Sequence, residues 1–463
     1  MCGVFGVRSL ERDVARLTYF GLFALQHRGQ ESAGIAVSER GRVTAVREMG
    51  LVPQVFDEEK LSALPGEVAI GHTRYSTTGG ARWANAQPVV FHGSARTVAL
   101  CHNGNLVDPE PLRDELVAAG VRLASTSDTE VIAALLARDS SPLPEAVATT
   151  MRRLEGAYSV VAIADGVLVA FRDPLGIRPL TLGQVGDDWV VASETCALDL
   201  VGADVVRDVA PGELVWIDDD GWHSAQAVPR GRSAACIFEH VYFARPDSIL
   251  DGTGVYAGRV RMGERLADEA PVEADLVMPI PDSGTPAAIG FAKRSGVPFE
   301  EGLIKNRYVG RTFIQPDQEL RRQGIRLKFN PLAAEIADRR IVIVDDSIVR
   351  GNTMRALVEM LKAAGAAEVH VRISSPPVVS PCFYGIDMAD EDELAAAHRS
   401  VEEMREHVDA TSLSYLTLEG MQWATRLPEE AVCRACFTRR YPTVVPAERS
   451  AAKLRFEGSP VRT

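Results

Sequence analysis

The sequence lacks any long run of hydrophobic residues. No stretch of about 18 uncharged apolar residues occurs among its 463 residues, so we expect no membrane span. Charged residues also interrupt the apolar stretch near the start, and we therefore expect no signal peptide. Internal repeats and low-complexity segments are missing too. With 46% hydrophobic and 24% charged residues, the chain is expected to be an ordinary globular protein of the cytoplasm.

An excess of positive charge is also missing. The formal net charge is −13, whereas nucleic-acid binding requires clustered positive charge. We therefore expect no nucleic-acid partner. Any ligand that carries phosphate must be held by local loops.

The length predicts about two or three domains, and the first half is rich in short strands. The predicted strands are 68–72, 97–101, 158–163, 167–171 and 189–192. The predicted helices are 15–26, 109–119 and 129–137. This pattern favours antiparallel sheets with helices on their outer faces. Polar turn-forming residues at 218–221 and 229–232 predict a boundary near residue 230, which gives domains 1–230 and 231–463.

In the second half, short strands alternate with helices. The predicted strands are 276–280, 341–344 and 369–373, and the predicted helices are 284–295 and 353–364. Such alternation is typical of a doubly wound parallel sheet. Residues 305–330 are basic and poorly periodic, which predicts a mobile loop.

The second residue of the chain is a cysteine. Removal of Met1 would leave a thiol and a free α-amino group on Cys2, at the tip of an apolar strand. Because a free α-amino group titrates near pH ~7.7–8.0, it can act as a base beside the thiol. This is the arrangement of N-terminal nucleophile hydrolases. An early cysteine alone is weak evidence, since it can also occur by chance.

A strand that ends in two acids is the sharpest local signal. Residues 341–344 are followed by Asp345 and Asp346, then by a Ser/Gly/Thr loop and a helix. Ligands bind beyond the carboxyl ends of parallel strands, and a helix N-terminus attracts phosphate. The two acids can take sugar hydroxyls or a hydrated Mg²⁺. The alternative, an acidic helix cap, would normally contribute one acid and no such loop.

This segment resembles the diphosphosugar loop of type I phosphoribosyltransferases, which bind phosphoribosyl pyrophosphate (PRPP) with Mg²⁺. The resemblance assigns Asp345 and Asp346 to the ribose hydroxyls and Mg²⁺, and Ser283 to the metal as well. Lys305 and Arg307 match a loop that closes over the pyrophosphate. The implied 5-phosphate site consists of Ser347, Ile348, Val349, Arg350, Gly351, Asn352 and Thr353.

The first half resembles a class II glutamine amidotransferase domain. The matching segments are 2–6, 25–34, 71–77, 102–106 and 127–130. The resemblance implies that Cys2 attacks the glutamine carboxamide, and that Asn103 and Gly104 stabilise the oxyanion. It also implies a glutamine site formed by Arg74, Thr77, Gly104 and Asp128, with His27 and Arg28 as supporting residues.

We expect the seven cysteines to form no disulfide framework, because no secretory signal is expected. Four thiolates can bind a [4Fe–4S] cluster or structural Zn²⁺, and from chemistry alone zinc is the commoner outcome. The chain resembles the amidophosphoribosyltransferase family, and the resemblance to its iron–sulfur branch implies a [4Fe–4S] cluster bound by Cys236, Cys382, Cys433 and Cys436. Cys101 and Cys196 are expected to be buried, inert thiols.

Over its full length the chain resembles the amidophosphoribosyltransferase family. The implied fold is an N-terminal nucleophile hydrolase αββα sandwich followed by a type I phosphoribosyltransferase sheet. The implied reaction converts glutamine and PRPP to 5-phosphoribosylamine, glutamate and pyrophosphate, the first step of purine biosynthesis. Further implied features are one Mg²⁺ per subunit, inhibition by purine nucleotides, and a homo-oligomer, expected to be a tetramer. Candidates to line an ammonia passage are Tyr75, Tyr308, Phe313 and Ile314.

Three other functions remain open from the sequence. Glucosamine-6-phosphate synthase shares the first domain type, but its second half would lack the loop at 345–351. A transcription regulator of the phosphoribosyltransferase fold would lack the glutaminase motifs. An enzyme that uses only free ammonia would result if Met1 were retained or the Cys2 thiol were blocked.

Overall fold

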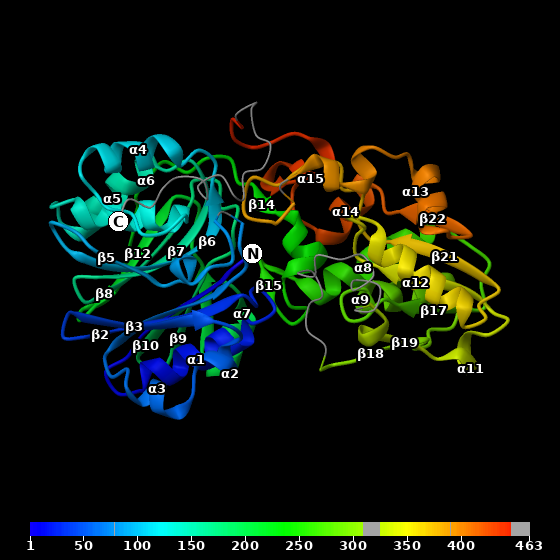
Figure 1. The fold of residues 1–463 in the computed structure, drawn as a ribbon, viewed down its shortest axis with the longest axis horizontal. Helices are drawn as coiled ribbons and strands as arrows, with labels where there is room; N and C mark the ends of the chain where they lie inside the picture. The colour runs from blue at the N-terminus through cyan, green and yellow to red at the C-terminus, as the bar shows by residue number, and fades with distance from the viewer. Residues whose placement is uncertain (78, 309–324, 389, 446–463) are drawn as a thin grey trace.

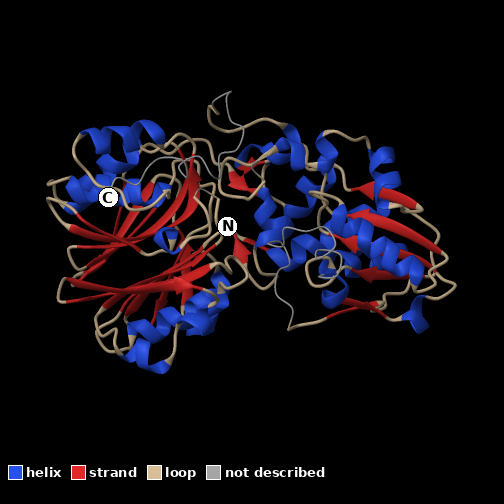
Figure 2. Cartoon of the chain, viewed as in Figure 1, coloured by secondary structure: helices blue, strands red, loops and turns tan. Residues whose placement is uncertain are grey.

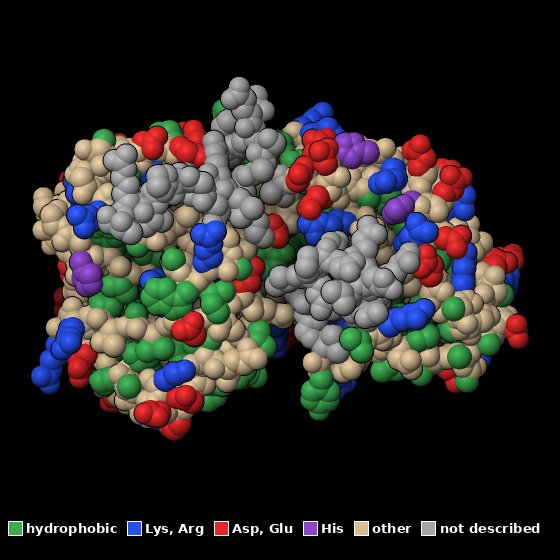
Figure 3. All heavy atoms as spheres, viewed as in Figure 1, with side chains coloured by type: hydrophobic (Ala, Val, Ile, Leu, Met, Phe, Trp, Pro, Cys, Tyr) green, Lys and Arg blue, Asp and Glu red, His purple; other side chains and the backbone are tan. Residues whose placement is uncertain are grey.

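The computed structural model describes residues 1–77, 79–308, 325–388 and 390–445. Phe313 and Ile314, two candidates for the passage, lie outside the described residues. The two halves of the chain lie side by side, and the N-terminus lies at their junction (Figure 1). In the described part, every helix is too short or too polar to cross a membrane. Acidic and basic side chains are interspersed over the face shown in Figure 3.

The first half contains a seven-stranded sheet in which all pairings are antiparallel. In spatial order its strands are β11 (Asp204–Asp208), β9 (Thr181–Val185), β10 (Asp188–Ala192), β1 (Gly3–Arg8), β4 (Val68–Arg74), β2 (Ser32–Glu39) and β3 (Arg42–Met49). Strand β1 is therefore central, with β10 on one side and β4 on the other. This position fixes the backbone that follows Cys2.

A six-stranded antiparallel sheet packs against the first. Its order is β13 (Gly221–Gln226), β12 (Glu213–Asp218), β8 (Val167–Arg172), β7 (Gly156–Ala164), β6 (Thr97–Leu106) and β5 (Val89–His92). Buried apolar residues from both sheets, such as Val4, Ile70 and Val161, fill the space between them. Alternate residues of each strand face this core because successive side chains point to opposite faces of a sheet.

Helices cover the outer face of each sheet (Figures 1 and 2). The seven-stranded sheet is covered by α1 (Val14–Ala24), α2 (Val52–Val55), α3 (Glu58–Ser62) and α7 (Thr195–Val201). The six-stranded sheet is covered by α4 (Glu110–Ala118), α5 (Asp128–Arg138) and α6 (Leu143–Arg153). The predicted αββα sandwich is confirmed.

The second half is built on a four-stranded parallel sheet, β17 (Leu276–Pro279), β20 (Arg340–Asp345), β21 (Glu368–Ile373) and β22 (Ser412–Tyr415). Helices α8 (Val255–Glu269), α9 (Thr285–Ser295) and α14 (Leu418–Thr425) pack on one face. Helices α12 (Asn352–Ala363) and α13 (Val401–Val408) pack on the other. Helices on both faces confirm the predicted doubly wound sheet.

Short elements lie between and around these layers. The two-stranded pairs are β14 (Ala235–Cys236) with β23 (Val432–Cys433), β15 (Ile249–Leu250) with β16 (Thr253–Gly254), and β18 (Leu303–Lys305) with β19 (Phe329–Pro331). The short helices are η1 (Trp83–Asn85), η2 (Glu239–Phe243), α11 (Ala333–Ile336), η3 (Glu391–Glu393), η4 (Ala395–Ala397), η5 (Glu429–Ala431) and α15 (Ala435–Thr438). Of these, η2 is a π-helix. Such turns are rare and occur often at functional sites.

The predicted elements agree with the structure except at some ends. The prediction ended one strand at residue 101, but β6 continues to Leu106 because it pairs with β7 as far as Gly156. Asn103 and Gly104 therefore lie within a strand. The helix predicted over 15–26 ends at Ala24.

Candidate functional site

Cys2 lies at the junction of the two halves, one residue before β1. Its side chain is buried, and its thiol donates to the carbonyl oxygen of Tyr75 at 3.5 Å. The backbone N–H of Cys2 donates to Asn103 Oδ1 at 3.2 Å. The nitrogen that would become the free amine is thus already held beside the second predicted catalytic residue.

Asn103 is fully buried on β6, opposite Ser159 of β7. Its Oδ1 is occupied by Cys2, while its Nδ2 has no hydrogen-bond partner among the described residues. A buried amide donor without a partner is costly in a folded protein. A ligand oxygen next to the Cys2 thiol would satisfy it, which is what an oxyanion site requires.

Gly104 follows Asn103 with a φ of +149°, which favours glycine. A Cβ here would lie 2.0 Å from the carbonyl oxygen of Ala157. A segment of the second half lies close to Gly104. A Cβ added to Gly385 of that segment would lie 3.0 Å from the carbonyl carbon of Gly104. Asn105 Nδ2 also donates to the carbonyl of Phe383 at 3.1 Å. The strand that carries Asn103 is therefore covered by a segment of the second half.

Asp128 begins α5 and is buried. It accepts from the backbone N–H of Leu106 at 2.9 Å, and its Oδ1 lies 3.7 Å from His102 Nδ1. Burial acts to raise the pKa of Asp128, but His102 and the backbone N–H groups outweigh it and hold this pKa below its usual value. The carboxylate is thus charged and able to accept an ammonium group.

Arg74 ends β4 and is also buried. Its guanidinium donates to the carbonyls of Gly80 and Gly79 at 3.0 and 3.1 Å, and lies 3.6 Å from Glu31. A substrate carboxylate at Arg74 would have to displace these carbonyl contacts. Thr77 is half-buried in the turn that follows Arg74.

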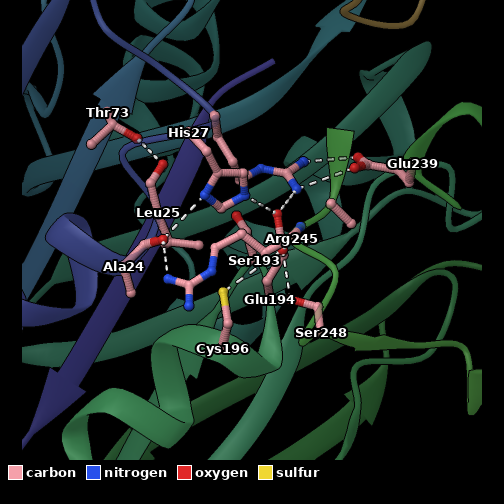
Figure 4. Close-up of polar contacts among 12 residues, drawn as sticks. Ala24, Leu25, His27, Thr73, Ser193, Glu194, Cys196, Glu239, Arg245 and Ser248 are labelled. Carbon is pink, nitrogen blue, oxygen red and sulfur yellow. Dashed lines mark hydrogen bonds and ion pairs between the residues drawn. The ribbon is translucent and has the colours of Figure 1, made fainter. Parts of the chain in front are cut away.

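Two buried carboxylates that the sequence did not single out lie behind Cys2. Glu194 accepts from His27 Nε2 at 2.8 Å and also pairs with Arg28 (Figure 4). Burial acts to raise the pKa of Glu194, but His27 and Arg28 hold it well below its usual range. Glu239 accepts from Arg28 Nη2 at 2.8 Å. No local motif signals these residues, because their partners lie far along the chain.

The second candidate site lies at the carboxyl ends of β17 and β20. Asp345 ends β20, and Asp346 accepts from Ser347 Oγ at 2.6 Å and also from Ser283. Burial raises the pKa of Asp345 well above its usual value, and the adjacent Asp346 adds to this effect. Burial raises the pKa of Asp346 too, although Ser283, Ser347 and Arg259 oppose it. Two adjacent acids, of which Asp346 is buried and Asp345 half-buried, are suited to a divalent cation.

The loop after Asp346 leads into the N-terminus of α12. Gly351 has a φ of +80° and a Cβ there would meet the His407 ring at 3.2 Å, so glycine suits this turn. Ile348 is buried, and Arg350 pairs with Glu393. The predicted loop members lie between β20 and the first turn of α12: Ser347, Ile348, Val349, Arg350, Gly351, Asn352 and Thr353.

The two basic residues of the predicted closing loop differ in their surroundings: Lys305 is in an ion pair and Arg307 is exposed. Lys305, the last residue of β18, pairs with Asp282. Arg307 is exposed, and Tyr308 is 99% exposed. Lys328, which the sequence did not single out, lies close enough to Asp345 to lower its pKa. In the sequence, only its position directly before the strand β19 could have indicated that Lys328 lies near the site, and this signal is weak.

The four predicted cysteine ligands come together from three distant segments. Cys236 of β14 lies directly opposite Cys433 of β23. Cys382 accepts from the backbone N–H of Tyr384 at 3.4 Å through its sulfur. Burial raises the pKa of Cys436 well above its usual value, and the neighbouring thiols of Cys236, Cys433 and Cys382 add to this. The four thiols therefore lie close enough together to influence one another's titration.

In the described residues, no set of three or more His, Cys, Asp or Glu side chains is arranged to hold a single metal ion. A tetrahedral zinc requires four sulfurs about 2.3 Å from one centre. A four-iron cluster keeps its thiolates farther apart, because each one binds a different iron. The four thiols supply the number of ligands that either group requires. The two acids at Asp345 and Asp346 fit Mg²⁺, which is commonly held by one or two carboxylates together with substrate phosphates.

The remaining two cysteines are buried, as predicted. Burial raises the pKa of Cys101 and of Cys196 above the usual thiol value. Such thiols are poor nucleophiles, because the thiolate is the reactive form.

Two family profiles match separate parts of the chain. A family profile described as a glutamine amidotransferase domain matches residues 72–200, and one described as a phosphoribosyl transferase domain matches residues 247–374. The amidophosphoribosyltransferase of Synechococcus elongatus is 52% identical, over 98% of this chain and 94% of the relative. The amidophosphoribosyltransferase of Archaeoglobus fulgidus is 48% identical, over 97% of this chain and 99% of the relative.

Two solved structures superpose over nearly the whole chain. One is glutamine PRPP amidotransferase from B. subtilis complexed with ADP and GMP, with a TM-score of 0.92 and 44% identity over 98% of this chain and all of that chain. The other is described as the allosteric regulatory enzyme of purine biosynthesis, with a TM-score of 0.92 and 45% identity over 98% of both chains.

Proposed function

Because the chain belongs to the amidophosphoribosyltransferase family, we propose that it transfers the amide nitrogen of glutamine to PRPP. The products are 5-phosphoribosylamine, glutamate and pyrophosphate, and the reaction is the first step of purine biosynthesis. The observation that carries the assignment is the unpartnered Asn103 Nδ2 beside Cys2. It supplies an oxyanion donor next to a nucleophile in the same chain as the Asp345–Asp346 loop.

In the first half, Cys2 attacks the carboxamide carbon of glutamine, and the negative charge that develops on oxygen is stabilised by Asn103 Nδ2 and Gly104. The α-amine of Cys2, once Met1 is removed, carries the proton to the departing ammonia, and water then hydrolyses the Cys2 thioester to release glutamate and the free thiol. Arg74 binds the glutamine carboxylate and Asp128 its ammonium, with Thr77 beside Arg74. These charges select a free amino acid over a peptide.

In the second half, Asp345 and Asp346 bind the ribose hydroxyls of PRPP, and residues 347–353 hold its 5-phosphate at the start of α12. Backbone N–H groups at a helix N-terminus favour this contact. Mg²⁺ held by Asp345, Asp346 and Ser283 would neutralise charge on the pyrophosphate. Lys305 contributes a positive charge to the same leaving group.

We assign glutamine hydrolysis to residues 1–230 and phosphoribosyl transfer to residues 231–463. This boundary is supported by the end of β13 at Gln226 and by the start of β14 at Ala235. Ammonia must cross from Cys2 to the ribose by a route that excludes water. In bulk water it would be protonated and could no longer act as a nucleophile. Tyr75, whose carbonyl contacts the Cys2 thiol, is well placed at the start of this route.

A [4Fe–4S] cluster held by Cys236, Cys382, Cys433 and Cys436 would link the end of the chain to the segment between the halves. Iron and sulfide analysis tests this assignment, and a zinc-loaded, colourless protein would contradict it. Purine nucleotides are proposed as inhibitors, since the B. subtilis relative was solved with ADP and GMP. A homo-oligomeric, tetrameric assembly in the cytoplasm completes the proposal.

The deciding experiment measures pyrophosphate release from PRPP with glutamine and, separately, with ammonium. The assay requires Mg²⁺, anaerobic buffer and protein whose N-terminus has been verified by mass spectrometry. We expect both nitrogen donors to work once Met1 is removed. Release with neither donor would contradict the assignment, and release with ammonium only would restrict it to the second half.

A further inference from the structure

A buried ion cluster joins the two halves directly behind Cys2. Arg28, which is fully buried in the first half, donates from Nε to the carbonyl oxygen of Cys2 at 2.8 Å. The same guanidinium binds both oxygens of Glu239, at 2.8 and 3.1 Å. One planar group thus connects the backbone of the nucleophile to a carboxylate from the second half.

Each half of the chain also contributes one carboxylate that accepts hydrogen bonds from the other half. Glu194, from the first half, accepts from the backbone N–H of Arg245 at 2.9 Å and from Ser248 Oγ at 2.6 Å (Figure 4). Glu239, from the second half, accepts from Arg28. Each carboxylate therefore satisfies donors of the opposite half, and neither half can bury its charges alone.

Glu239 is itself held firmly. It begins the π-helix η2, and Arg259 of α8 donates to the carbonyls of His240 and Ala244, both at 2.8 Å. Arg259 is 3% exposed and lies near Asp346, whose pKa it acts to lower. The segment that presents Glu239 is thus anchored to the helix behind the second candidate site.

Once Met1 is removed, as the proposed function requires, Cys2 is the first residue of the chain and needs such an anchor. Terminal residues are poorly ordered unless they are tied down. The regular strand begins only at Gly3, so Cys2 is fixed by its contacts with Asn103, Tyr75 and Arg28. Of these three residues, Arg28 alone contacts the carbonyl oxygen of Cys2. The orientation of the Arg28 guanidinium is in turn set by its ion pairs with Glu194 and Glu239.

We propose that Glu239 is a positioning residue for glutamine hydrolysis, which acts from the second half by orienting Arg28 and through it the backbone of Cys2. This inference rests on the proposed function. The thiol and the amine of Cys2 are both attached to its Cα. If the carbonyl group of Cys2 shifted away from Arg28, the Cα would move with it and both groups would be misplaced together. Misplacement by about 1 Å can cost about 100-fold in rate.

The test compares Glu239→Gln with Glu213→Gln. Glu213 is a matched control, because it also binds both terminal nitrogens of an arginine, Arg207, at 2.6 and 2.7 Å, but lies away from Cys2 on β12. We expect Glu239→Gln to lower glutamine-dependent kcat by about 10- to 100-fold, with KM for glutamine changed less than about threefold. Ammonia-dependent turnover should stay within about twofold in both variants, and Glu213→Gln should keep glutamine turnover as well.

Equal glutamine turnover in the two variants would overturn the proposal, and so would a parallel loss of the glutamine and ammonia activities in folded Glu239→Gln. If Glu239→Gln fails to fold, Glu239→Asp keeps the charge but shortens the side chain. A selective loss of glutamine turnover in this variant would support the proposal, and wild-type turnover would overturn it.

A second readout separates this inference from the proposed function. The rate of Cys2 alkylation by iodoacetamide, measured without substrates, should change in Glu239→Gln and not in Glu213→Gln. If the wild-type protein releases no pyrophosphate with either nitrogen donor, the proposed function fails, but the alkylation rates still test the link between Glu239 and Cys2. Equal alkylation rates would overturn it.

Discussion

The two candidate sites differ in how complete they are in the folded chain alone. Around Cys2 the charged groups are buried and already paired, as shown by Asp128 with His102 and by Arg28 with two carboxylates. At the second site, Asp345 and Asp346 are adjacent and both have raised pKa values. Lys305 forms an ion pair with Asp282. The charged groups of the first site are paired by the fold, whereas we propose that a cation and a ligand balance the charges of the second.

This difference fits the chemistry of each half. Glutamine hydrolysis uses protein groups only, so the nucleophile and the oxyanion donor can be fixed in advance. Transfer to PRPP involves a charged leaving group that comes with its metal ion. The predictions below test whether the two sites can be damaged separately.

The largest effect is expected from Cys2→Ala. This change removes the nucleophile and should lower glutamine-dependent turnover by roughly 10⁴-fold or more, while ammonia-dependent turnover remains. Pyrophosphate release with each nitrogen donor is the measurement. Loss of both activities in a folded variant would contradict the separation of the sites.

Asn103→Leu should have the next largest effect. It removes the unpartnered Nδ2 donor and also the Oδ1 that accepts from the Cys2 N–H, while keeping a similar size, and kcat for glutamine should fall by about 10²- to 10³-fold. The KM for glutamine should change little, because Arg74 and Asp128 are untouched. A variant with raised KM and normal kcat would show that Asn103 binds the substrate and does not stabilise the oxyanion.

Asp346→Asn should damage the second site by a smaller factor. Loss of one charged hydrogen-bonding group should weaken PRPP binding by about 10- to 100-fold, as measured by calorimetry with Mg²⁺. Glutaminase activity measured without PRPP should stay at the wild-type level. Unchanged synthesis of phosphoribosylamine would count against the assigned loop.

The smallest effect concerns stability at mildly acidic pH. Burial lowers the pKa of His72 in the first half to about 3 and that of His240 in the second half to about 4. Because both folded-state pKa values lie below the unfolded value near ~6.5, the folded protein binds fewer protons and loses stability as pH falls. Between pH 7.5 and 5.5 each group should cost about 1.4 kcal/mol in the free energy of unfolding.

The variant His240→Phe removes the contribution of the second half and leaves that of His72. Denaturant unfolding at the two pH values should show a decrease smaller by about 1.4 kcal/mol than in the wild type. An identical decrease in both proteins would mean that His240 is not a buried neutral imidazole.

The sequence predicted the layers of the fold because periodicity and turn residues are local signals. The helix predicted over 129–137 is observed at Asp128–Arg138, and the strand predicted over 341–344 at Arg340–Asp345. Motif residues such as Asp346 were found for the same reason, since a strand end and the loop after it are adjacent in sequence.

Long-range partners were not predictable in this way. Glu239 lies 211 residues from Arg28, and each looks like an ordinary charged residue in its own segment. The pairing of Cys236 with Cys433 depends on a two-residue parallel bridge that has no periodic signature. The contacts of Arg74 with Gly79 and Gly80 could not be read either, because they depend on the path of a turn.

The close approach of Gly385 to Gly104 limits how this enzyme can change over evolutionary time. Gly385 has a φ of +107°, and any side chain there would press on the strand that presents Asn103. A substitution in the sugar-binding half would therefore appear as a defect in ammonia production, with the sugar site itself intact. Genetic screens that sort mutations by position would assign such a lesion to the wrong half.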